Sequence, residues 1–167
     1  MKRLLGAIDA LSILSGKASS FLTLPIIFII MYEVISRYVF NAPTVWASEI
    51  IAILCGIYLV MGGAYVLQMD AHVKVDIIYS NFSRRQRTII DIITSPLILL
   101  YLFVIVYTGF IYGIESWEFR ETTGTAANMP IYPLKISFFV ASFLMTLQMI
   151  AKIITDIRRV FFAKEVR

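Results

Sequence analysis

The sequence has little of what soluble enzymes and metalloproteins use for chemistry. It contains one cysteine, Cys55, and one histidine, His72, among 167 residues. A single cysteine excludes an internal disulfide bond, and together these two residues supply too few nitrogen and sulfur ligands for a zinc site of the usual kind. No serine, histidine and aspartate stand in a pattern typical of nucleophilic catalysis, and no glycine-rich phosphate loop is present. These absences argue against an enzyme and against a metal or cofactor site.

Charge is also scarce. Charged residues make up 16% of the chain and apolar residues 59%, compared with roughly 25% and 45–50% in soluble domains. Such a surplus of apolar surface needs a non-aqueous solvent, so the sequence predicts an integral membrane protein. Four continuous apolar segments, at about 18–40, 46–69, 88–114 and 134–157, are each long enough to cross a bilayer core, which takes about 20 helical residues. We therefore predict a single all-α membrane domain, 1–167, with four transmembrane helices.

The segments outside the spans have predicted structures of their own. The connection 41–45 is short and contains Pro43, so the first two helices form a tight antiparallel hairpin. The N-terminal stretch Lys2–Leu14 resembles a signal peptide, but Asp9 interrupts its apolar region and a full span follows, so a short interfacial helix is expected there. A second interfacial helix is predicted at 73–82, where apolar residues recur at helical spacing, with a soluble loop as the alternative. Ser83 and Gln86 have the spacing of a capping box that begins the third helix.

The basic residues predict the orientation. Twelve of the 15 lysines and arginines lie before the first span, in the loop after the second span, or at the end of the fourth span. Under the positive-inside rule, both termini are then cytoplasmic. This distribution accounts for the net charge of +4 as a signal of topology and of attraction to anionic lipid. We therefore expect membrane lipids as partners and no binding of nucleic acid.

Charge next to the first hairpin needs an explanation because it is costly near lipid. Glu33 and Arg37 are four residues apart, in the favourable order for a helical ion pair. Glu49, on the second helix, is expected at a similar depth, so Arg37 is predicted to lie between two carboxylates. Fastening of the hairpin or docking of a partner is the favoured role. Proton or ion coupling and simple snorkelling of the arginine remain alternatives.

Several further residues predict bends and helix packing. Pro25 and Pro96 predict bends in the first and third helices, and Gln148 predicts an interhelical hydrogen bond. Gly109 and Gly113 form a GxxxG pattern, which fits internal packing and contact with a partner equally well.

The largest outer segment is the loop at about 115–133. Its glycine and prolines exclude a continuous helix, while its aromatic residues suit the membrane interface. A plain connector is the alternative, but the length of the loop makes it the best outward-facing contact surface. The candidates for docking a partner there are Trp117, Glu118, Arg120, Glu121, Pro130 and Tyr132.

Three stretches, EVISRYVFNAPTVWASEI, AHVKVDII and ESW…ETTGTAANMPIYPLK, resemble the small membrane subunit of TRAP transporters, the tripartite ATP-independent periplasmic transporters. The matching positions are Arg37, Trp46 and Glu49 in the first stretch, His72, Val73 and Asp76 in the second, and Trp117, Pro130 and Pro133 in the third. We take as candidates for structural or subunit-interface roles Glu33, Arg37, Asn41, Trp46, Glu49, His72 and Asp76.

The resemblance implies partners rather than chemistry in this chain. In that family a large membrane subunit holds the substrate and sodium sites and moves like an elevator, and a periplasmic substrate-binding protein delivers an organic acid. The resemblance thus implies a scaffold in the bacterial inner membrane that anchors the large subunit and helps to dock the binding protein. It implies no catalytic residue, no substrate-binding residue and no cofactor in this chain. The rival hypothesis is an autonomous four-helix, proton-coupled transporter or channel with Glu33 as the coupling acid.

Overall fold

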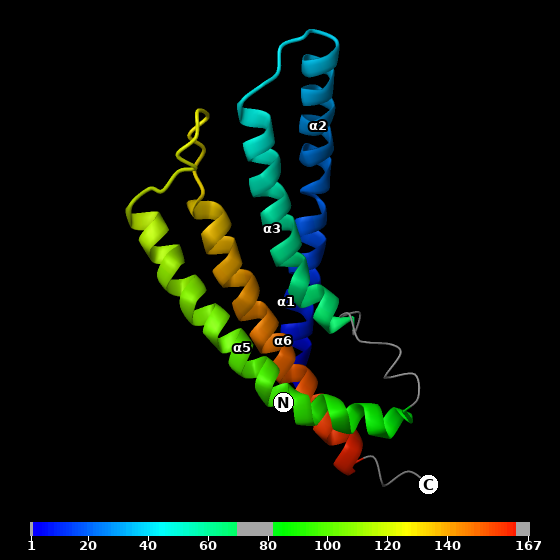
Figure 1. The fold of residues 1–167 in the computed structure, drawn as a ribbon. Coiled ribbons are helices and arrows are strands. Elements are labelled where there is room, and N and C mark those ends of the chain that lie inside the picture. The colour runs from blue at the N-terminus through cyan, green and yellow to red at the C-terminus, as the bar shows by residue number, and fades with distance from the viewer. Residues whose placement is uncertain (1, 70–81, 163–167) are drawn as a thin grey trace.

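The computed structural model describes residues 2–69 and 82–162, and this part of the chain is helical. Its helices are α1 (Lys2–Ser20), α2 (Thr23–Tyr38), α3 (Trp46–Gln68), α5 (Arg84–Glu118) and α6 (Tyr132–Phe162), as Figure 1 shows. Within the described residues, four stretches are long and apolar enough to cross a membrane, namely Arg3–Tyr38, Trp46–Gln68, Gln86–Glu118 and Tyr132–Arg158. The predicted all-α fold with four membrane-spanning helices is confirmed. The predicted interfacial helix at 73–82 falls almost entirely outside the described residues, as do His72 and Asp76.

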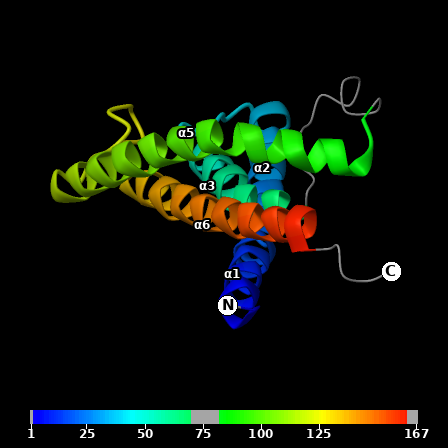
Figure 2. The same ribbon diagram turned by 90° about the horizontal axis from the view of Figure 1, so that it is seen from below.

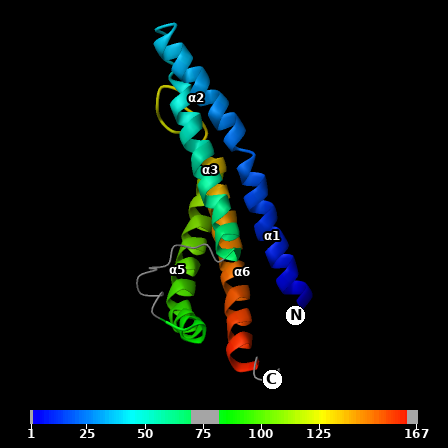
Figure 3. The ribbon, with the colours of Figure 1, turned by 90° about the vertical axis from the view of Figure 1, so that its right-hand side faces the viewer.

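The first span is longer than predicted because α1 and α2 form one nearly continuous rod (Figure 3). At 36 residues and about 1.5 Å per residue, the rod measures roughly 54 Å, well beyond a hydrocarbon core of about 30 Å. The N-terminal segment, expected to be an interfacial helix, is helical as part of α1, which continues toward α2 and packs against α3 and α6.

Where a bend was predicted at Pro25, the structure has a local irregularity between α1 and α2. Pro25 has no amide proton to donate to the carbonyl of Phe21, and its ring would clash with that carbonyl in a regular helix. The backbone there tightens, with the amide of Leu22 donating to Ser19 O at 2.9 Å and that of Leu24 donating to Phe21 O at 3.3 Å. The rod therefore continues through a local adjustment rather than a break.

Helix α5 begins at the predicted capping box. Ser83 N donates to Gln86 Oε1 at 2.8 Å, and Gln86 N donates to Ser83 Oγ at 3.4 Å. The helix contains Pro96, which removes one hydrogen bond of the ladder and favours a kink. Its first part runs across the lower end of the bundle in Figure 1, and the rest climbs beside α6 (Figure 2). The predicted bend is thus confirmed, and the helix begins at the predicted capping box, four residues before the predicted apolar span at 88–114.

The helices converge at one end and diverge at the other. Leu67, near the end of α3, forms a buried apolar cluster with Leu102 of α5 and Met149 of α6. Toward the other end, the α2–α3 pair and the α5–α6 pair spread apart like the arms of a V (Figure 1). An ideal Cβ on Gly109 would lie 3.4 Å from Phe139 Cα. The GxxxG pattern therefore serves packing of α5 on α6 within the α5–α6 arm.

A buried polar contact joins α1 to α6 near the converging end. Gln148 Nε2 donates to Asp9 Oδ1 at 2.8 Å, and Ser12 Oγ donates to Gln148 Oε1 at 2.8 Å. Ser12 and Gln148 are buried. The interhelical hydrogen bond predicted for Gln148 is confirmed, and its partners lie in the segment that was expected to be a separate interfacial helix.

Candidate functional site: the charged hairpin and the outer loop

The α2–α3 hairpin turns within a few residues. Helix α2 ends at Tyr38 and α3 begins at Trp46. Between them, Asn41 has a φ of 53°, a left-handed conformation that asparagine tolerates better than most residues. The Ala42 amide donates to Ser36 O at 2.9 Å and closes the end of the helix. The rings of Tyr32 and Trp46 stack at 5.7 Å between centroids, so aromatic contact also holds the two helices together.

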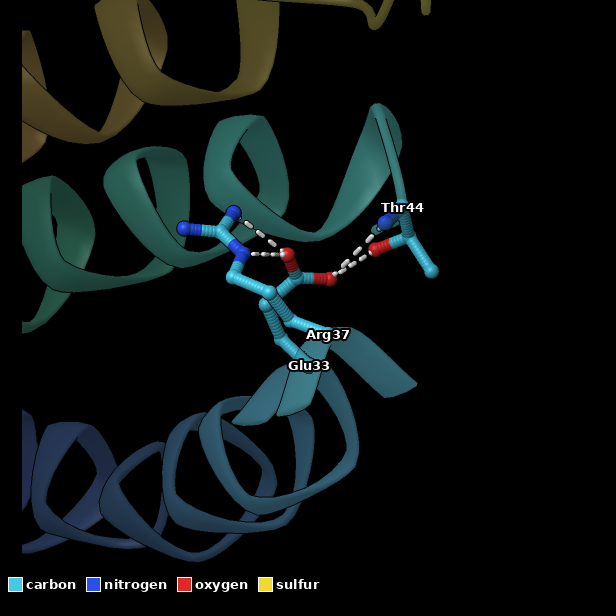
Figure 4. A network of polar contacts seen from close by, with 3 residues as sticks. All are labelled: Glu33, Arg37 and Thr44. Carbon is cyan, nitrogen blue, oxygen red and sulfur yellow. Dashed lines mark hydrogen bonds and ion pairs between the residues drawn. The ribbon is translucent and has the colours of Figure 1, made fainter. Parts of the chain in front are cut away.

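Glu33 is the centre of a polar network inside this hairpin, drawn in Figure 4. Arg37 donates to Glu33 Oε1 from Nε at 3.1 Å and from Nη2 at 2.6 Å. The other carboxylate oxygen accepts the Thr44 amide at 3.2 Å and the Thr44 hydroxyl. Glu33 therefore neutralises Arg37 with one oxygen and holds the turn with the other. The predicted ion pair is confirmed, whereas the hydrogen bonds from Thr44 to Glu33 were not predicted from the sequence.

Arg37 is only partly used by this network. Its side chain is 51% exposed, compared with 11% for that of Glu33. Its second terminal nitrogen, Nη1, points away from the carboxylate in Figure 4. The guanidinium group can therefore satisfy Glu33 and still meet another polar group at the surface of the helix pair.

The contacts of the Glu49 side chain differ from those predicted. Its carboxylate accepts the Thr123 hydroxyl on Oε2 at 2.8 Å and the Thr125 hydroxyl on Oε1. The expected arrangement, with Arg37 between Glu33 and Glu49, is wrong because both oxygens of Glu49 are bound to the outer loop. The helical spacing of Glu33 and Arg37 could be read from the sequence. The threonine partners of Glu49 are more than 70 positions away and gave no comparable signal.

The outer loop folds back on itself as a short antiparallel turn. Thr123 N donates to Met129 O at 2.8 Å, and Met129 N donates to Thr123 Oγ1 at 3.1 Å. A bridge joins Thr122 to Pro130. Gly124, with a φ of 65°, and Asn128, with a φ of 50°, supply the left-handed residues that such a reversal needs. The loop is thus an ordered element rather than a plain connector.

At the base of the loop, the predicted docking residues form two groups. The rings of Trp117 and Tyr132 meet edge to face at 5.3 Å, and the Arg120 guanidinium lies 4.8 Å from the centroid of Trp117 and 5.9 Å from that of Tyr132. Separately, Glu121 pairs with Lys135. The hydrogen bond from Lys135 holds the pKa of the Glu121 carboxyl below its usual value.

The remaining two docking candidates lie beside these groups. Pro130 takes part in the bridge to Thr122, and Glu118, the last residue of α5, is exposed. The structure thus brings the predicted docking residues together at one end of the α5–α6 arm.

An open apolar groove of about 400 Å³ lies below the loop. Its only hydroxyl apart from that of Tyr132 belongs to Ser137, which donates to Leu134 O at 2.7 Å. Its lining residues are Ile57, Met61, Trp117, Tyr132, Pro133, Ile136, Ser137 and Val140. This lining suits hydrocarbon and offers no charged partner to an organic acid. Within residues 2–69 and 82–162, no three histidine, cysteine or acidic side chains are grouped so that they could hold a metal ion.

Comparison with protein families places this arrangement in context. A family model described as "Tripartite ATP-independent periplasmic transporters, DctQ component" matches residues 26–159. The match covers most of the chain and includes the charged hairpin and the outer loop. No curated protein matches the sequence.

Proposed function

Since the chain belongs to the DctQ family, the small permease component of tripartite ATP-independent periplasmic transporters, we propose that it anchors the large membrane subunit and helps to dock the periplasmic binding protein. The system it serves is a sodium-coupled transporter of organic acids. In this proposal the chain itself carries no substrate and catalyses no reaction. It supplies a fixed frame against which the large subunit moves like an elevator.

The charge distribution supports an orientation for this frame. Basic residues gather at one end of each span. The N-terminal end of the α1–α2 rod carries Lys2, Arg3 and Lys17, and the other basic clusters lie after α3 and near the end of α6. This excess favours a cytoplasmic side that contains both termini. The α2–α3 turn and the outer loop then face the periplasm, and the inner membrane is the location that fits a periplasmic partner.

The exposed surface of α2 is the observation that carries the anchoring role. Its main helix contact is α3, and the side of α2 away from α3 is a broad apolar surface. The exposed large side chains include Leu24, Ile27, Phe28, Met31, Val34 and Ile35. Lipid alone would satisfy this surface, but a half-exposed Arg37 at its end would gain from a polar partner in another protein. We therefore assign α2 and Arg37 to contact with the large subunit.

The outer loop supports the docking role. It is ordered, it carries exposed polar residues together with the Arg120–Trp117–Tyr132 stack, and it lies at the end assigned to the periplasm. Aromatic residues and arginine are enriched where proteins bind one another. We assign substrate and sodium binding to the large subunit. The apolar lining of the groove below the loop agrees with that division of labour.

The rival function, proton coupling through Glu33, fits the geometry less well. A coupling acid must be free to exchange its proton, whereas one oxygen of Glu33 is bound by Arg37 and the other by Thr44. Glu33 also lies about one turn from the end of α2, while coupling sites usually lie closer to the bilayer midplane. These contacts favour a fastening role.

Reconstitution of the parts tests the proposal. The chain, the large membrane subunit and both together are placed in proteoliposomes, with purified binding protein and a sodium gradient outside. The organic acid used is the one that most stabilises the binding protein against heat. We expect uptake only when both membrane subunits, the binding protein and sodium are present. Uptake by this chain alone would refute the proposal and favour the autonomous transporter.

A further inference from the structure

The two arms of the V are linked at their open end by Glu49. This residue lies in the first turn of α3, and its carboxylate spans to two threonines of the outer loop, which belongs to the α5–α6 arm. The Glu49 carboxylate also interacts with the backbone of Met129 and Ala127, so one side chain joins the first turn of α3 to the tip of the outer loop. The apolar helix contacts between the arms lie further down, for example where Leu134 packs on Gly56.

The threonines that Glu49 binds are the residues that close the loop. Thr123 exchanges hydrogen bonds with Met129 through both its amide and its hydroxyl group. The carbonyl of Thr125 accepts the Asn128 amide at 3.1 Å, and the hydroxyl groups of Thr123 and Thr125 lie 2.8 Å apart. Glu49 therefore acts on the two points that shape the tip of the loop. Without it, the tip keeps its internal bonds but loses its attachment to α3.

These hydrogen bonds fix the position of the outer loop relative to α3. The tip residues are mostly exposed, and the base of the loop is fixed to its own arm by the Glu121–Lys135 pair and the Arg120 stack. Only the far side of the loop needs a support from the other arm, and Glu49 provides it. A loop that is held in place before binding avoids the entropy cost of being ordered during binding.

We propose that Glu49 is a positioning residue, which fixes the outer loop in the conformation that the periplasmic binding protein recognises. The inference rests on the proposed docking function and adds the residue that prepares the surface for it. Glu49 itself need not touch the binding protein. Its effect passes through Thr123 and Thr125.

The test measures uptake by the reconstituted two-subunit complex as the binding protein is titrated. We expect Glu49→Gln and Thr125→Val to raise the half-saturating concentration of binding protein by about 5- to 100-fold, the loss expected when a few side chains must be ordered on binding. The maximal rate, reached at saturating binding protein, stays close to that of the wild type. Glu115→Gln removes an exposed acid near the same end without touching the loop tip and leaves both values unchanged.

A second measurement guards against a general folding defect. Amide hydrogen exchange of residues 122–130 in the assembled complex should accelerate in Glu49→Gln, while exchange in α3 and α6 stays as in the wild type. Unchanged exchange in the loop would overturn the inference. So would a variant that lowers the maximal rate and leaves the half-saturating concentration unchanged.

Arg120→Ala separates this inference from the docking function on which it rests. If Arg120→Ala weakens the response to binding protein and Glu49→Gln does not, docking at the loop stands and the role of Glu49 is refuted. If neither variant changes the half-saturating concentration, the docking function is refuted and the role of Glu49 with it.

Discussion

The contact between Gly16 of α1 and Tyr65 of α3 allows a quantitative test of how the first span packs. An ideal Cβ on Gly16 would lie 2.5 Å from Tyr65 Cβ, far inside van der Waals contact. Tyr65 Cβ is attached directly to the backbone of α3, so a rotamer change cannot move it away. Gly16→Ala must therefore push α1 and α3 apart. Overpacking of this kind costs about 1–3 kcal/mol.

Gly62→Ala is the matched control, because nothing lies within 4 Å of an added Cβ at that position. Alanine is favoured over glycine within a helix by up to about 1 kcal/mol, a gain that both variants share. We therefore expect Gly62→Ala to be neutral or stabilising and Gly16→Ala to be less stable than it by about 1–3 kcal/mol. Gly63→Ala should fall between them, since its new Cβ would meet the flexible end of Met145.

The assay is reversible unfolding of the purified chain in mild detergent, by titration with a denaturing detergent and with tryptophan fluorescence as the signal. If Gly16→Ala proves as stable as Gly62→Ala, α1 does not pack on α3 as described. The N-terminal segment would then be better explained as the separate interfacial helix that the sequence suggests.

Three further predictions concern the polar contacts. Arg37→Ala should reduce recovery of the large subunit in co-purification several-fold, while the apparent substrate affinity of the complex that does form changes little. Ser12→Ala should destabilise the chain by about 0.5–1.5 kcal/mol in the same unfolding assay, since it removes a buried hydrogen bond to Gln148. Because the pKa of Glu121 is lowered by Lys135, its stabilising effect is full above the usual carboxyl pKa and fades as pH falls below it. The wild type should thus lose stability on acidification more steeply than Glu121→Gln.

Each of these predictions has an outcome that contradicts it. Intact recovery of the large subunit with a weakened substrate affinity would remove Arg37 from the interface. For Ser12, the control is Ser20→Ala, which deletes an exposed hydroxyl bonded only within its own helix. Equal effects of the two serine variants would mean that the contact with Gln148 is not stabilising. Parallel acid profiles for the wild type and Glu121→Gln would show that the ion pair does not persist in solution.

The parts of the fold that could be predicted are those encoded by neighbouring residues. The four apolar runs, the capping box at Ser83 and the Glu33–Arg37 pair each depend on residues within one span or one helical turn. The lengths of the helices were less predictable. Polarity falls off gradually at a helix end, so nothing in the composition shows that α1 continues into α2, whereas the capping box at Ser83 does indicate where α5 begins.

The long-range contacts could not be predicted, and the hairpin shows why. Glu33 and Glu49 look equivalent in the sequence, because each is an acid near the same turn and at a similar depth. Their partners distinguish them. Glu33 meets Arg37 and Thr44, which the turn itself brings close, whereas Glu49 meets threonines placed by the packing of α5 and α6. Only the fold of the whole bundle determines which of the two acids pairs with Arg37.

This difference gives the two acids separate consequences for the assembly. Glu33 makes the hairpin a self-sufficient unit, with its charge balanced inside α2 and the following turn. Among residues 2–69 and 82–162, Glu49 meets no cation and instead joins that unit to the outer loop. Apolar packing joins the arms from Leu67, near the end of α3, to Gly56, where Leu134 packs from the start of α6. That packing does not include the tip of the outer loop, which the hydrogen bonds of Glu49 attach to the first turn of α3. Because hydrogen bonds are directional, loss of this one side chain should release the tip of the loop without unfolding either arm.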